Sequence, residues 1–377
     1  MPKVSVILPT FNRADTIMRA VKSVQAQSFQ DWELIVVDDG STDNTAALLA
    51  GIDGRIRLIR QENRGFTEAR NAGIRAGSGD YFAFIDSDDE FMPHHLELCV
   101  AFLETFKEEQ FVSAELLEDF GHGRVVNHYR VETSDWYPKK AALIGSHGLD
   151  LPPGETDDYL RVYELREQIG DWGSRIVERC YPGHDAFLYR GMIFEHMRYD
   201  FLVTITATVM RSSVFESLGL PEPGWFTGSD FHYMARLCKT WRANFLSIPT
   251  FIKHEYADNG ALPQLGHVCT GNSALRFSAD WQRAWDDLFW TARSPDSELR
   301  GLRSLRQFWM AQVALNSGER ELTLQYLAEA RAGLARFWRA IALYWLVRCL
   351  PGLTPARTIC WALDRVRYRV RTTWYSQ

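Results

Sequence analysis

The sequence predicts an α/β protein in which a mostly parallel sheet with helices on both faces is followed by an all-helical C-terminal region. In the first hundred residues, near-continuous apolar runs that read as buried strands alternate with segments of helical periodicity. This is the pattern of a parallel sheet with crossover helices. After residue 271 the strand signals end and amphipathic helical segments follow. At 377 residues, the chain is long enough for two or three domains.

The first 110 residues carry the clearest elements. Apolar runs predict strands at residues 4–8, 32–37, 56–59 and 81–85. Apolar side chains at three- and four-residue intervals predict helices at residues 14–27, 43–50, 66–76 and 93–106. Polar clusters follow three of these strands. Because ligands of parallel sheets bind at the carboxyl ends of the strands, we expect the clusters to line one site.

The middle of the chain is less regular. Further strands are predicted at residues 111–117, 124–130, 203–210, 245–248 and 250–253. Further helices are predicted at residues 157–169, 214–218, 231–241, 281–290, 298–316 and 319–336. A segment rich in proline, glycine and polar residues predicts a loop or lid at residues 131–156. We expect residues 1–110 and 111–270 to form the two halves of one α/β domain, and residues 271–377 to form a helical region.

The composition excludes several classes of protein. Lys and Arg number 42 against 48 Asp and Glu, a net charge of -6, whereas a dedicated nucleic-acid-binding protein normally carries a basic excess. Six cysteines without a CxxC pair favour a reducing compartment over a disulfide scaffold. The sequence shows neither a secretory signal nor an uninterrupted apolar window of membrane-spanning length. We therefore expect a cytoplasmic protein that does not bind nucleic acid.

The last 47 residues differ from the rest in charge. Residues 331–377 contain nine Arg, no Lys and one acidic residue, Asp364, and they mix arginine with Trp and Tyr. Arginine attracts anionic lipid headgroups, and Trp and Tyr favour the membrane interface. The segment therefore predicts contact with the inner face of the cytoplasmic membrane. A helical bundle packed on the catalytic domain, or a dimer contact, is the alternative.

Residues 86–89, Asp-Ser-Asp-Asp, directly follow a predicted strand. Carboxylates this close together repel one another, and a folded protein tolerates them best around a divalent cation such as Mg²⁺ or Mn²⁺, which prefers oxygen ligands. Such a cation can bridge the oxygens of a diphosphate. An isolated acidic quartet is more often a solvated turn that caps the next helix, but the other strand-end clusters favour a ligand site.

Two further features point to the same edge of the sheet. The turn Asp38-Asp39-Gly40-Ser41 offers a carboxylate for a base N–H or a ribose hydroxyl, and Gly40 lets a ligand approach the backbone. An ordinary Asp-Gly-Ser turn is the alternative. Arg70, on the helix predicted at residues 66–76, is suited to pair with a phosphate or with the acids. A surface salt bridge is the alternative.

Four segments together resemble glycosyltransferase family 2, the inverting enzymes of the GT-A fold. They occur in the order and spacing of that family, cover about the first 95 residues, and read VSVILPTFN, WELIVVDDGSTDNT, ENRGFTEARNAGI and GDYFAFIDSDDEF. The resemblance implies a nucleotide-sugar-binding half in residues 1–110, and an acceptor-binding half with the catalytic base in residues 111–270. It also implies a nucleoside-diphosphate sugar donor, most commonly a UDP-sugar, and Mn²⁺ or Mg²⁺ as cofactor. The acceptor would be a glycan or glycolipid of cell-surface polysaccharide assembly.

The resemblance also assigns site residues. Pro9, Thr10 and Asn12 match the segment that lines the base pocket, and Asp39 matches the acid that meets the base. In the acidic quartet, the first acid is expected near the ribose and the second on the metal. Nucleotide-sugar binding is therefore expected from Pro9, Thr10, Asn12, Asp39, Arg70, Asp86, Ser87 and Asp88.

An inverting transfer also needs a carboxylate that takes the proton of the acceptor hydroxyl. In similar enzymes this is an Asp at the start of a helix, often preceded by Glu and followed by an Arg-Leu pair. Residues 228–237, GSDFHYMARL, match with Asp230 as the catalytic base, although Ser229 replaces the Glu. A plain helix cap is the alternative. His254 stands where similar enzymes carry a His at a strand end, so it is expected to join Asp88 on the metal. A structural His is the alternative.

The sequence thus predicts a metal-dependent inverting glycosyltransferase. A nucleotidyltransferase would normally carry a glycine-rich phosphate loop after the first strand, where this chain has Pro9-Thr10-Phe11-Asn12. A non-catalytic protein that binds sugar nucleotides or glycans would need no base, and Asp230 argues against it.

Overall fold

The computed structural model describes residues 2–52, 54–121, 123, 125–144, 146–225, 227–255, 272–290 and 297–333. The chain divides into two units. Unit 1 consists of Met1–Lys139 and Gly148–Leu262, and unit 2 of Lys140–His147 and Pro263–Gln377.

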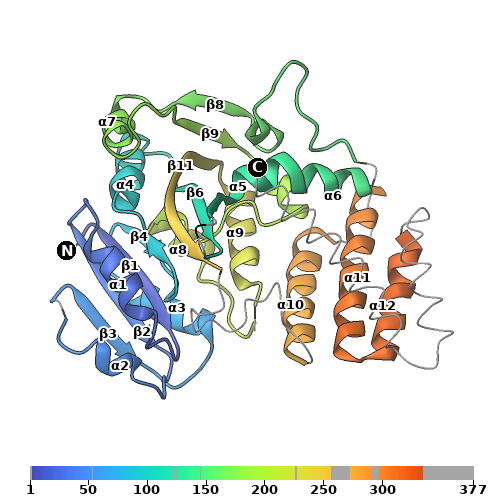
Figure 1. Ribbon diagram of the computed structural model, residues 1–377, viewed down its shortest axis with the longest axis horizontal. Coiled ribbons are helices and arrows are strands. Elements are labelled where there is room, and N and C mark those ends of the chain that lie inside the picture. Colours follow the sequence, from blue (N-terminus) through green and yellow to red (C-terminus); the bar gives the residue numbers. More distant parts are fainter. Residues whose placement is uncertain are drawn as a thin grey trace. The chain divides into compact units, whose positions relative to one another are not determined.

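Unit 1 is built on one sheet of eleven described strands (Figure 1), ordered β3-β2-β1-β4-β10-β6-β11-β9-β8, with β5 and β7 paired beside this path. The first four neighbours are parallel: β1 (Val4–Thr10), β2 (Trp32–Asp38), β3 (Ile56–Arg60) and β4 (Tyr81–Phe84). All seven residues of β1 are buried between β2 and β4, which explains its largely apolar sequence. The predicted α/β class is confirmed.

The rest of the sheet is mixed. Strand β10 (Thr208–Arg211) lies antiparallel between β4 and β6 (Phe111–Asp119), and β6 runs parallel to β11 (Ala243–His254). The remaining pairs are antiparallel: β11 with β9 (Phe187–Gly191) and β5 (Glu90–Phe91), β9 with β8 (Leu165–Gln168), and β6 with β7 (Val125–Asn127). Residues before and after position 110 therefore contribute strands to one continuous sheet.

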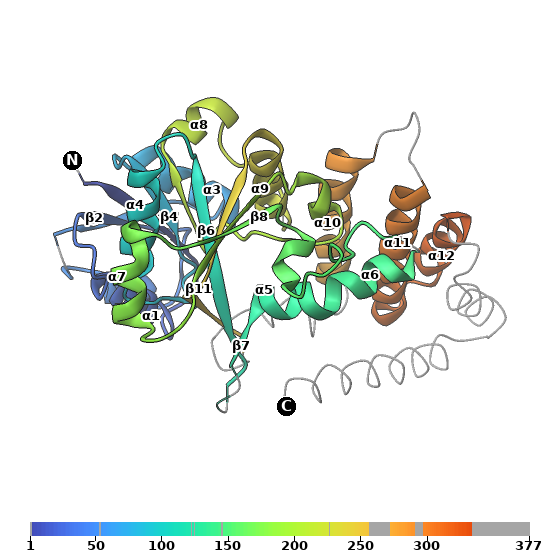
Figure 2. The ribbon, with the colours of Figure 1, turned by 90° about the horizontal axis from the view of Figure 1, so that it is seen from above.

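Helices flank the parallel strands on both sides. Figure 2 shows α1 (Ile17–Gln25) on one side and α3 (Phe66–Ala76) on the other. Helix α3 packs very closely on β1, because a Cβ added at Gly73 would lie 2.4 Å from Cγ2 of Ile7. The other helices of this unit are α2 (Thr45–Leu48), α4 (His95–Thr105), α7 (Asp171–Cys180), α8 (Ser213–Leu218) and α9 (Ser229–Thr240).

The loop predicted at residues 131–156 is wrong over its first half. This stretch is helical, in α5 (His128–Val131), a π-helical turn η1 (Glu132–Trp136) and α6 (Tyr137–Leu143). The buried carboxylate of Glu115 accepts hydrogen bonds from the backbone N–H groups of Tyr129 and Arg130, at 2.9 and 3.1 Å. It thereby satisfies donors that the first turn of a helix leaves free. Since Glu115 lies on β6, no local sequence signal reveals this partner.

The helix predicted at residues 157–169 is also wrong. A 3₁₀ turn, η2 (Asp158–Arg161), is followed by the edge strand β8. The Tyr159 hydroxyl donates to Glu115, and β8 pairs with β9, so tertiary partners override the local helical periodicity. Smaller differences concern two single predicted strands and one pair of predicted strands. Residues 203–210 form a strand only from β10 onward, residues 124–130 only in β7, and residues 245–248 and 250–253 belong to the single irregular strand β11.

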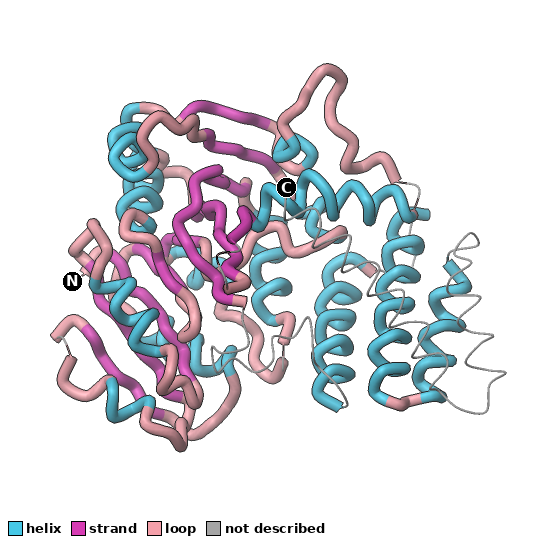
Figure 3. Tube along the Cα trace, viewed as in Figure 1, coloured by secondary structure: helices cyan, strands magenta, loops and turns pink. Residues whose placement is uncertain are grey.

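Helices make up the described elements of unit 2, as Figure 3 shows for α10 (Asn272–Phe289), α11 (Ser297–Ser317) and α12 (Arg320–Gly333). The helices predicted at residues 298–316 and 319–336 are confirmed as α11 and α12, which pack on each other and bury Leu305, Leu315 and Leu327. Within the described ranges, no helix is long and apolar enough to cross a bilayer.

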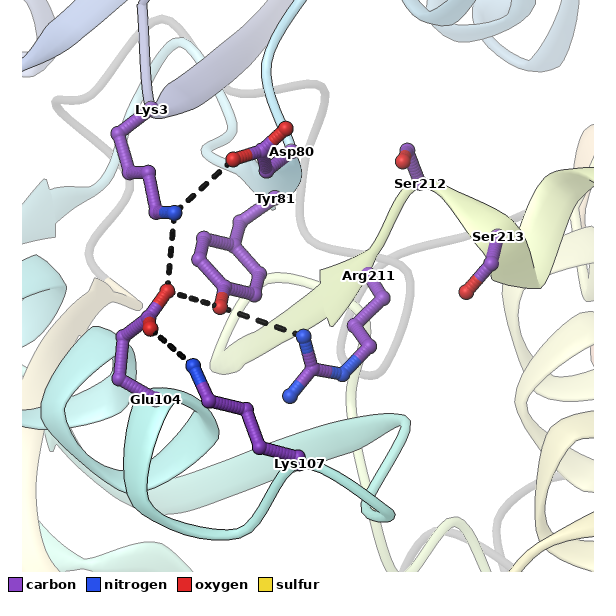
Figure 4. A pocket seen from close by; sticks show the side chains of 8 residues that line it. All are labelled: Lys3, Asp80, Tyr81, Glu104, Lys107, Arg211, Ser212 and Ser213. Carbon is purple, nitrogen blue, oxygen red and sulfur yellow. Dashed lines mark hydrogen bonds and ion pairs between the residues drawn. The ribbon is translucent and has the colours of Figure 1, made fainter.

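A network of charged side chains lies at the amino ends of β1 and β4 and surrounds a pocket of about 300 Å³ (Figure 4). The Glu104 carboxylate accepts hydrogen bonds from Lys107, Tyr81 and Lys3, which lower its pKa to about 2. Arg211 lies beside this group and donates to the backbone carbonyls of Leu103, Phe106 and Glu109. Two of those carbonyls come from the C-terminal end of α4 and the residue after it, where a cation is favoured.

We predict that Arg211→Met lowers the free energy of unfolding by about 2 kcal/mol or more, because a charged donor to three backbone carbonyls is lost. The matched control Lys107→Met removes an exposed ion pair and should change it by less than about 0.5 kcal/mol. Urea denaturation measures both. Equal effects would show that Arg211 does not hold the end of α4.

Candidate active site

The carboxyl ends of β1 and β2 are joined by paired loops. The two strands stay in register up to Thr10 and Asp38. Beyond them, the Asn12 side chain accepts a hydrogen bond from the N–H of Thr42 at 2.8 Å, and its own N–H donates to Ser41 Oγ at 2.9 Å. Asn12 has a φ of 52°, a left-handed conformation that Asn tolerates better than most residues. The predicted base-pocket segment is therefore held in a fixed shape.

Thr10 contributes an unsatisfied group to this edge. Its side chain is 4% exposed, and within the described part of the chain its Oγ1 has no hydrogen-bond partner. A buried hydroxyl without a partner is costly unless something binds it. This fits the prediction that Thr10 lines a ligand pocket, although no contact tests that role.

Asp39 organises the segment that leads into α3. Its carboxylate accepts hydrogen bonds from Gln61 Nε2 at 2.7 Å and from the backbone N–H groups of Arg64 and Gly65, both at 2.9 Å. The neighbouring Gly40 has a φ of 84°, and a Cβ there would lie 3.0 Å from the backbone nitrogen of Asn63. Asp39 thus sits at the expected strand end, while contact with a base stays a prediction.

The acidic quartet follows β4 and forms a crowded cluster. Burial raises the pKa of Asp86 to about 6; Arg70 opposes the rise, and the carboxylates of Asp88 and Asp230 add to it. Burial also holds the pKa of Asp89 well above its usual range, with further contributions from Asp88 and Asp86. Several acids therefore share one site, their repulsion contributes to the raised pKa values of Asp86 and Asp89, and a bound cation would relieve it.

Arg70 connects this cluster to a residue far along the chain. Its Nη2 lies 3.2 Å from Asp86 Oδ1, and its Nη1 donates to Asp230 Oδ1 at the start of α9. The arginine side chain is 1% exposed and stacks over the ring of Phe66, whereas the Asp230 side chain is 24% exposed. The structure therefore brings the predicted base, Asp230, next to the predicted donor-site residue Asp86, with the buried guanidinium of Arg70 between them.

His254 lies at the end of β11 between two carboxylates. Its Nε2 is 2.7 Å from Glu90 Oε1, its Nδ1 is 3.2 Å from Asp119 Oδ2, and its backbone N–H donates to Asp89. Both ring nitrogens are thus engaged, and one would have to leave its carboxylate to bind a metal. Glu90 and Asp119 were not predicted from the sequence, because only the pairing of β5 and β6 with β11 places them here.

The donor set suits a metal that is shared with a ligand rather than one held by protein alone. Among the described residues, no group of three His, Cys, Asp or Glu side chains is arranged to hold a metal ion. Magnesium, however, is commonly bound through one or two carboxylates plus substrate phosphates. Asp88 fits this role at the centre of the acid cluster, and His254 fits it only after rearrangement.

Two arginines that the sequence analysis did not select also reach Asp88. Nε of Arg13 lies 3.9 Å from Asp88 Oδ2, and Nη2 of Arg19 donates to the backbone carbonyl of Asp88. Arg19 also lies 3.6 Å from Glu90. A local signal existed for Arg13, which directly follows the strand-end segment. Arg19 gave none, since it reads as an ordinary polar position of α1.

Comparison with known proteins identifies the N-terminal part of the chain. Residues 5–144 match the family model Glycosyl transferase family 2. This segment contains the loops after β1, β2 and β4, so the predicted resemblance is confirmed where the strand-end clusters lie.

Curated relatives are similar over about a quarter of the chain. The GalNAc(5)-diNAcBac-PP-undecaprenol beta-1,3-glucosyltransferase of Campylobacter jejuni is 41% identical over 97 residues, 24% of this chain and 31% of that protein. The UDP-Glc:alpha-D-GlcNAc-diphosphoundecaprenol beta-1,3-glucosyltransferase of Escherichia coli is 39% identical over 102 residues, 26% of this chain and 40% of that protein. Among the curated relatives, the matched segments span 15% to 46% of their lengths.

A solved structure is similar over most of the chain. The crystal structure of S. aureus TarS 1-349 in complex with UDP-GlcNAc has a TM-score of 0.55 and 14% sequence identity, and the similarity covers 96% of this chain and 92% of that one. At this identity the comparison speaks for the fold alone, and it confirms the predicted GT-A fold.

Proposed function

We propose that this chain, whose residues 5–144 match the family model Glycosyl transferase family 2, is a metal-dependent inverting glycosyltransferase. It would move a sugar from a nucleoside-diphosphate donor to a hydroxyl of a glycan or lipid-linked glycan. The observation that carries the proposal is the position of the Arg70 guanidinium between Asp86 and Asp230. The predicted donor acids and the predicted base thereby share one site.

The relatives support a choice of substrates. The Escherichia coli relative is named for UDP-Glc, and both named relatives act on acceptors linked to undecaprenol through a diphosphate. We therefore favour a UDP-sugar as donor and a lipid-linked glycan as acceptor, in cell-surface polysaccharide assembly.

In the proposed reaction, an acceptor hydroxyl attacks the anomeric carbon from the face opposite the leaving diphosphate. Asp230 accepts the hydroxyl proton as the new bond forms. Because Arg70 already holds Oδ1 of Asp230, we assign proton transfer to Oδ2. The partial exposure of this side chain leaves room for an acceptor, and the buried arginine fixes the direction of the carboxylate.

The acids after β4 would act on the leaving group. Asp88, with His254 after rearrangement, would hold Mn²⁺ or Mg²⁺, and a bound metal ion would neutralise the charge that develops on the departing diphosphate. Asp86 would meet the ribose, and Thr10, Asn12 and Asp39 the base, as the resemblance implies. Pro9 and Ser87 would complete the walls of the donor site.

We predict that Asp230→Asn lowers kcat by about 10²- to 10⁴-fold, the usual contribution of a general base, while UDP affinity stays within twofold. Asparagine keeps the shape of the side chain but cannot accept the proton. Nucleotide release during transfer gives kcat, and calorimetry with UDP gives the affinity.

Asp171→Asn is the matched control for this experiment, since Asp171 occupies the first turn of α7 and is exposed. It should leave both quantities unchanged. An Asp230→Asn variant that turns over normally but binds UDP poorly would move the base elsewhere.

We predict that UDP-sugars raise the melting temperature of the protein, and that Mn²⁺ increases this shift. Asp88→Asn should abolish the Mn²⁺-dependent part, because the carboxylate that shares the metal with the diphosphate is lost. A thermal-shift screen of UDP-, GDP- and dTDP-sugars with and without Mn²⁺ measures this and also selects the donor for the transfer assay.

Asp80→Asn serves as the control, because Asp80 lies at the opposite edge of the sheet, in the network around Lys3. If no sugar nucleotide shifts the melting temperature under either condition, the proposed function fails. A full Mn²⁺ response in Asp88→Asn would remove Asp88 from the metal.

Contact of residues 331–377 with the inner face of the cytoplasmic membrane is a further part of the proposal. Almost all of this segment lies outside the described residues, so its sequence alone supports the idea. We predict that the full chain floats with vesicles rich in phosphatidylglycerol and not with phosphatidylcholine vesicles. Replacing its nine Arg by Gln should abolish flotation. Equal recovery in the soluble fraction with both kinds of vesicle would contradict membrane contact.

A further inference from the structure

One face of α3 contacts the segment that leads into the candidate base. Arg70 and Asn71 follow Thr67 by three and four residues, so both lie on the same side of the helix as Thr67. Thr67 Oγ1 lies 2.8 Å from Ser229 Oγ, and Asn71 Nδ2 donates to the carbonyl of Pro221 at 2.8 Å. Together with the pair between Arg70 and Asp230, three successive contacts attach this segment to α3.

Helix α3 is a firm reference for these contacts. At Gly73 its backbone packs directly against Ile7 of β1, with no room for a side chain. At its start, Asp39 holds the backbone of Gly65, the N-terminal flanking residue of α3. The helix is thus fixed to the two strands whose ends form the predicted donor site.

The start of α9 is anchored differently. Gly228 precedes the helix with a φ of 79°, and no side chain caps its first turn. The hydroxyl of Ser229 bonds instead to Thr67, and Ser229 is the residue before Asp230. Thr67 and Ser229 are 3% and 4% exposed and their hydroxyls bond to each other, so we do not assign either of them a contact with a substrate.

We propose that Thr67 and Ser229 form a positioning pair that sets the carboxylate of Asp230 relative to the donor site. This inference rests on the proposed function, because it assigns the pair to the base of that reaction. Arg70 pairs with the carboxylate of Asp230. The hydrogen bond between Thr67 and Ser229 holds the first residue of α9 in place. A small displacement of a catalytic group lowers the rate strongly. Loss of the hydrogen bond between Thr67 and Ser229 should therefore lower kcat.

The test is a double-mutant cycle with Thr67→Val and Ser229→Ala. Each single variant should lower kcat about tenfold, with the donor KM and UDP affinity within twofold, because only the direction of the base changes. The double variant should be no slower than the slower single variant, since both substitutions remove the same bond. The conservative variant Thr67→Ser should restore kcat.

A second buried hydroxyl pair provides the control. Ser113 Oγ lies 2.6 Å from Thr208 Oγ1 between β6 and β10, and both residues are fully buried. Ser113→Ala removes a bond of the same kind away from the candidate base, and Thr208→Val removes it together with the bond from Thr208 Oγ1 to the Thr204 carbonyl. Ser113→Ala should lower the melting temperature by an amount similar to that of Ser229→Ala, and both control variants should leave kcat within twofold.

Several outcomes overturn the proposal. Normal kcat in folded Thr67→Val would do so, as would multiplicative losses in the double variant or a loss of UDP affinity in place of kcat. If Thr67→Val does not fold, Ser229→Ala and the exchange variant Thr67→Ser with Ser229→Thr decide. The exchange variant keeps both hydroxyls, so its kcat should be normal. A low kcat in the exchange variant together with a normal kcat in Ser229→Ala would contradict the positioning role of the pair.

Failure of this inference can be told apart from failure of the proposed function. If the wild-type protein transfers no sugar, the function itself fails. If Asp230→Asn keeps its rate, the base is elsewhere. If Asp230→Asn is inactive while both single variants of the pair are normal, only the positioning role of Thr67 and Ser229 is wrong.

Discussion

The buried guanidinium of Arg70 is the interaction on which the site depends. It is almost fully removed from solvent, and it lies between Asp86, which follows β4, and Asp230, in the first turn of α9. A buried charge is tolerated only when it is paired, so the cation requires both carboxylates to stay near it. In return it reduces the repulsion among acids that would otherwise raise one another's pKa. The fold brings Asp86 and Asp230 close together, and the guanidinium of Arg70 fixes the geometry of the two carboxylates.

The sequence predicted the parallel half of the fold well because its signals are local there. Strands such as β1 are buried on both faces and need no outside partner to be recognised. The prediction failed where distant groups decide the structure. The first backbone N–H groups of α5 donate to the carboxylate of Glu115, which lies on a distant strand. Residues 165–168 form the strand β8 because they pair with β9. In both places the local pattern of residues 131–169 was outweighed by tertiary contacts.

The same distinction separates the residues that the sequence places at this edge of the sheet from those that only the structure brings there. Asp39, Asp86 and Asp88 follow directly after strands, so strand prediction alone located them at one edge. Their partners carry no such mark. Asp119 and Arg19 are ordinary charged residues in sequence, and only the pairing of β6 with β11 and the packing of α1 bring them to His254 and Asp88. A sequence can therefore indicate which residues lie at the strand ends before it indicates which residues hold them in place.

The departure of Ser229 from the expected Glu has a physical reading. The position is almost fully buried and faces Thr67, a short polar side chain on a helix that packs closely on β1 at Gly73. A carboxylate there would add a further negative charge beside Asp230 and Asp86, where Arg70 already serves two acids. A hydroxyl instead bonds to Thr67 without adding charge, and it leaves the arginine to the base. Residue 229 is thus coupled to residue 67, and the two positions should be understood as one unit of the site.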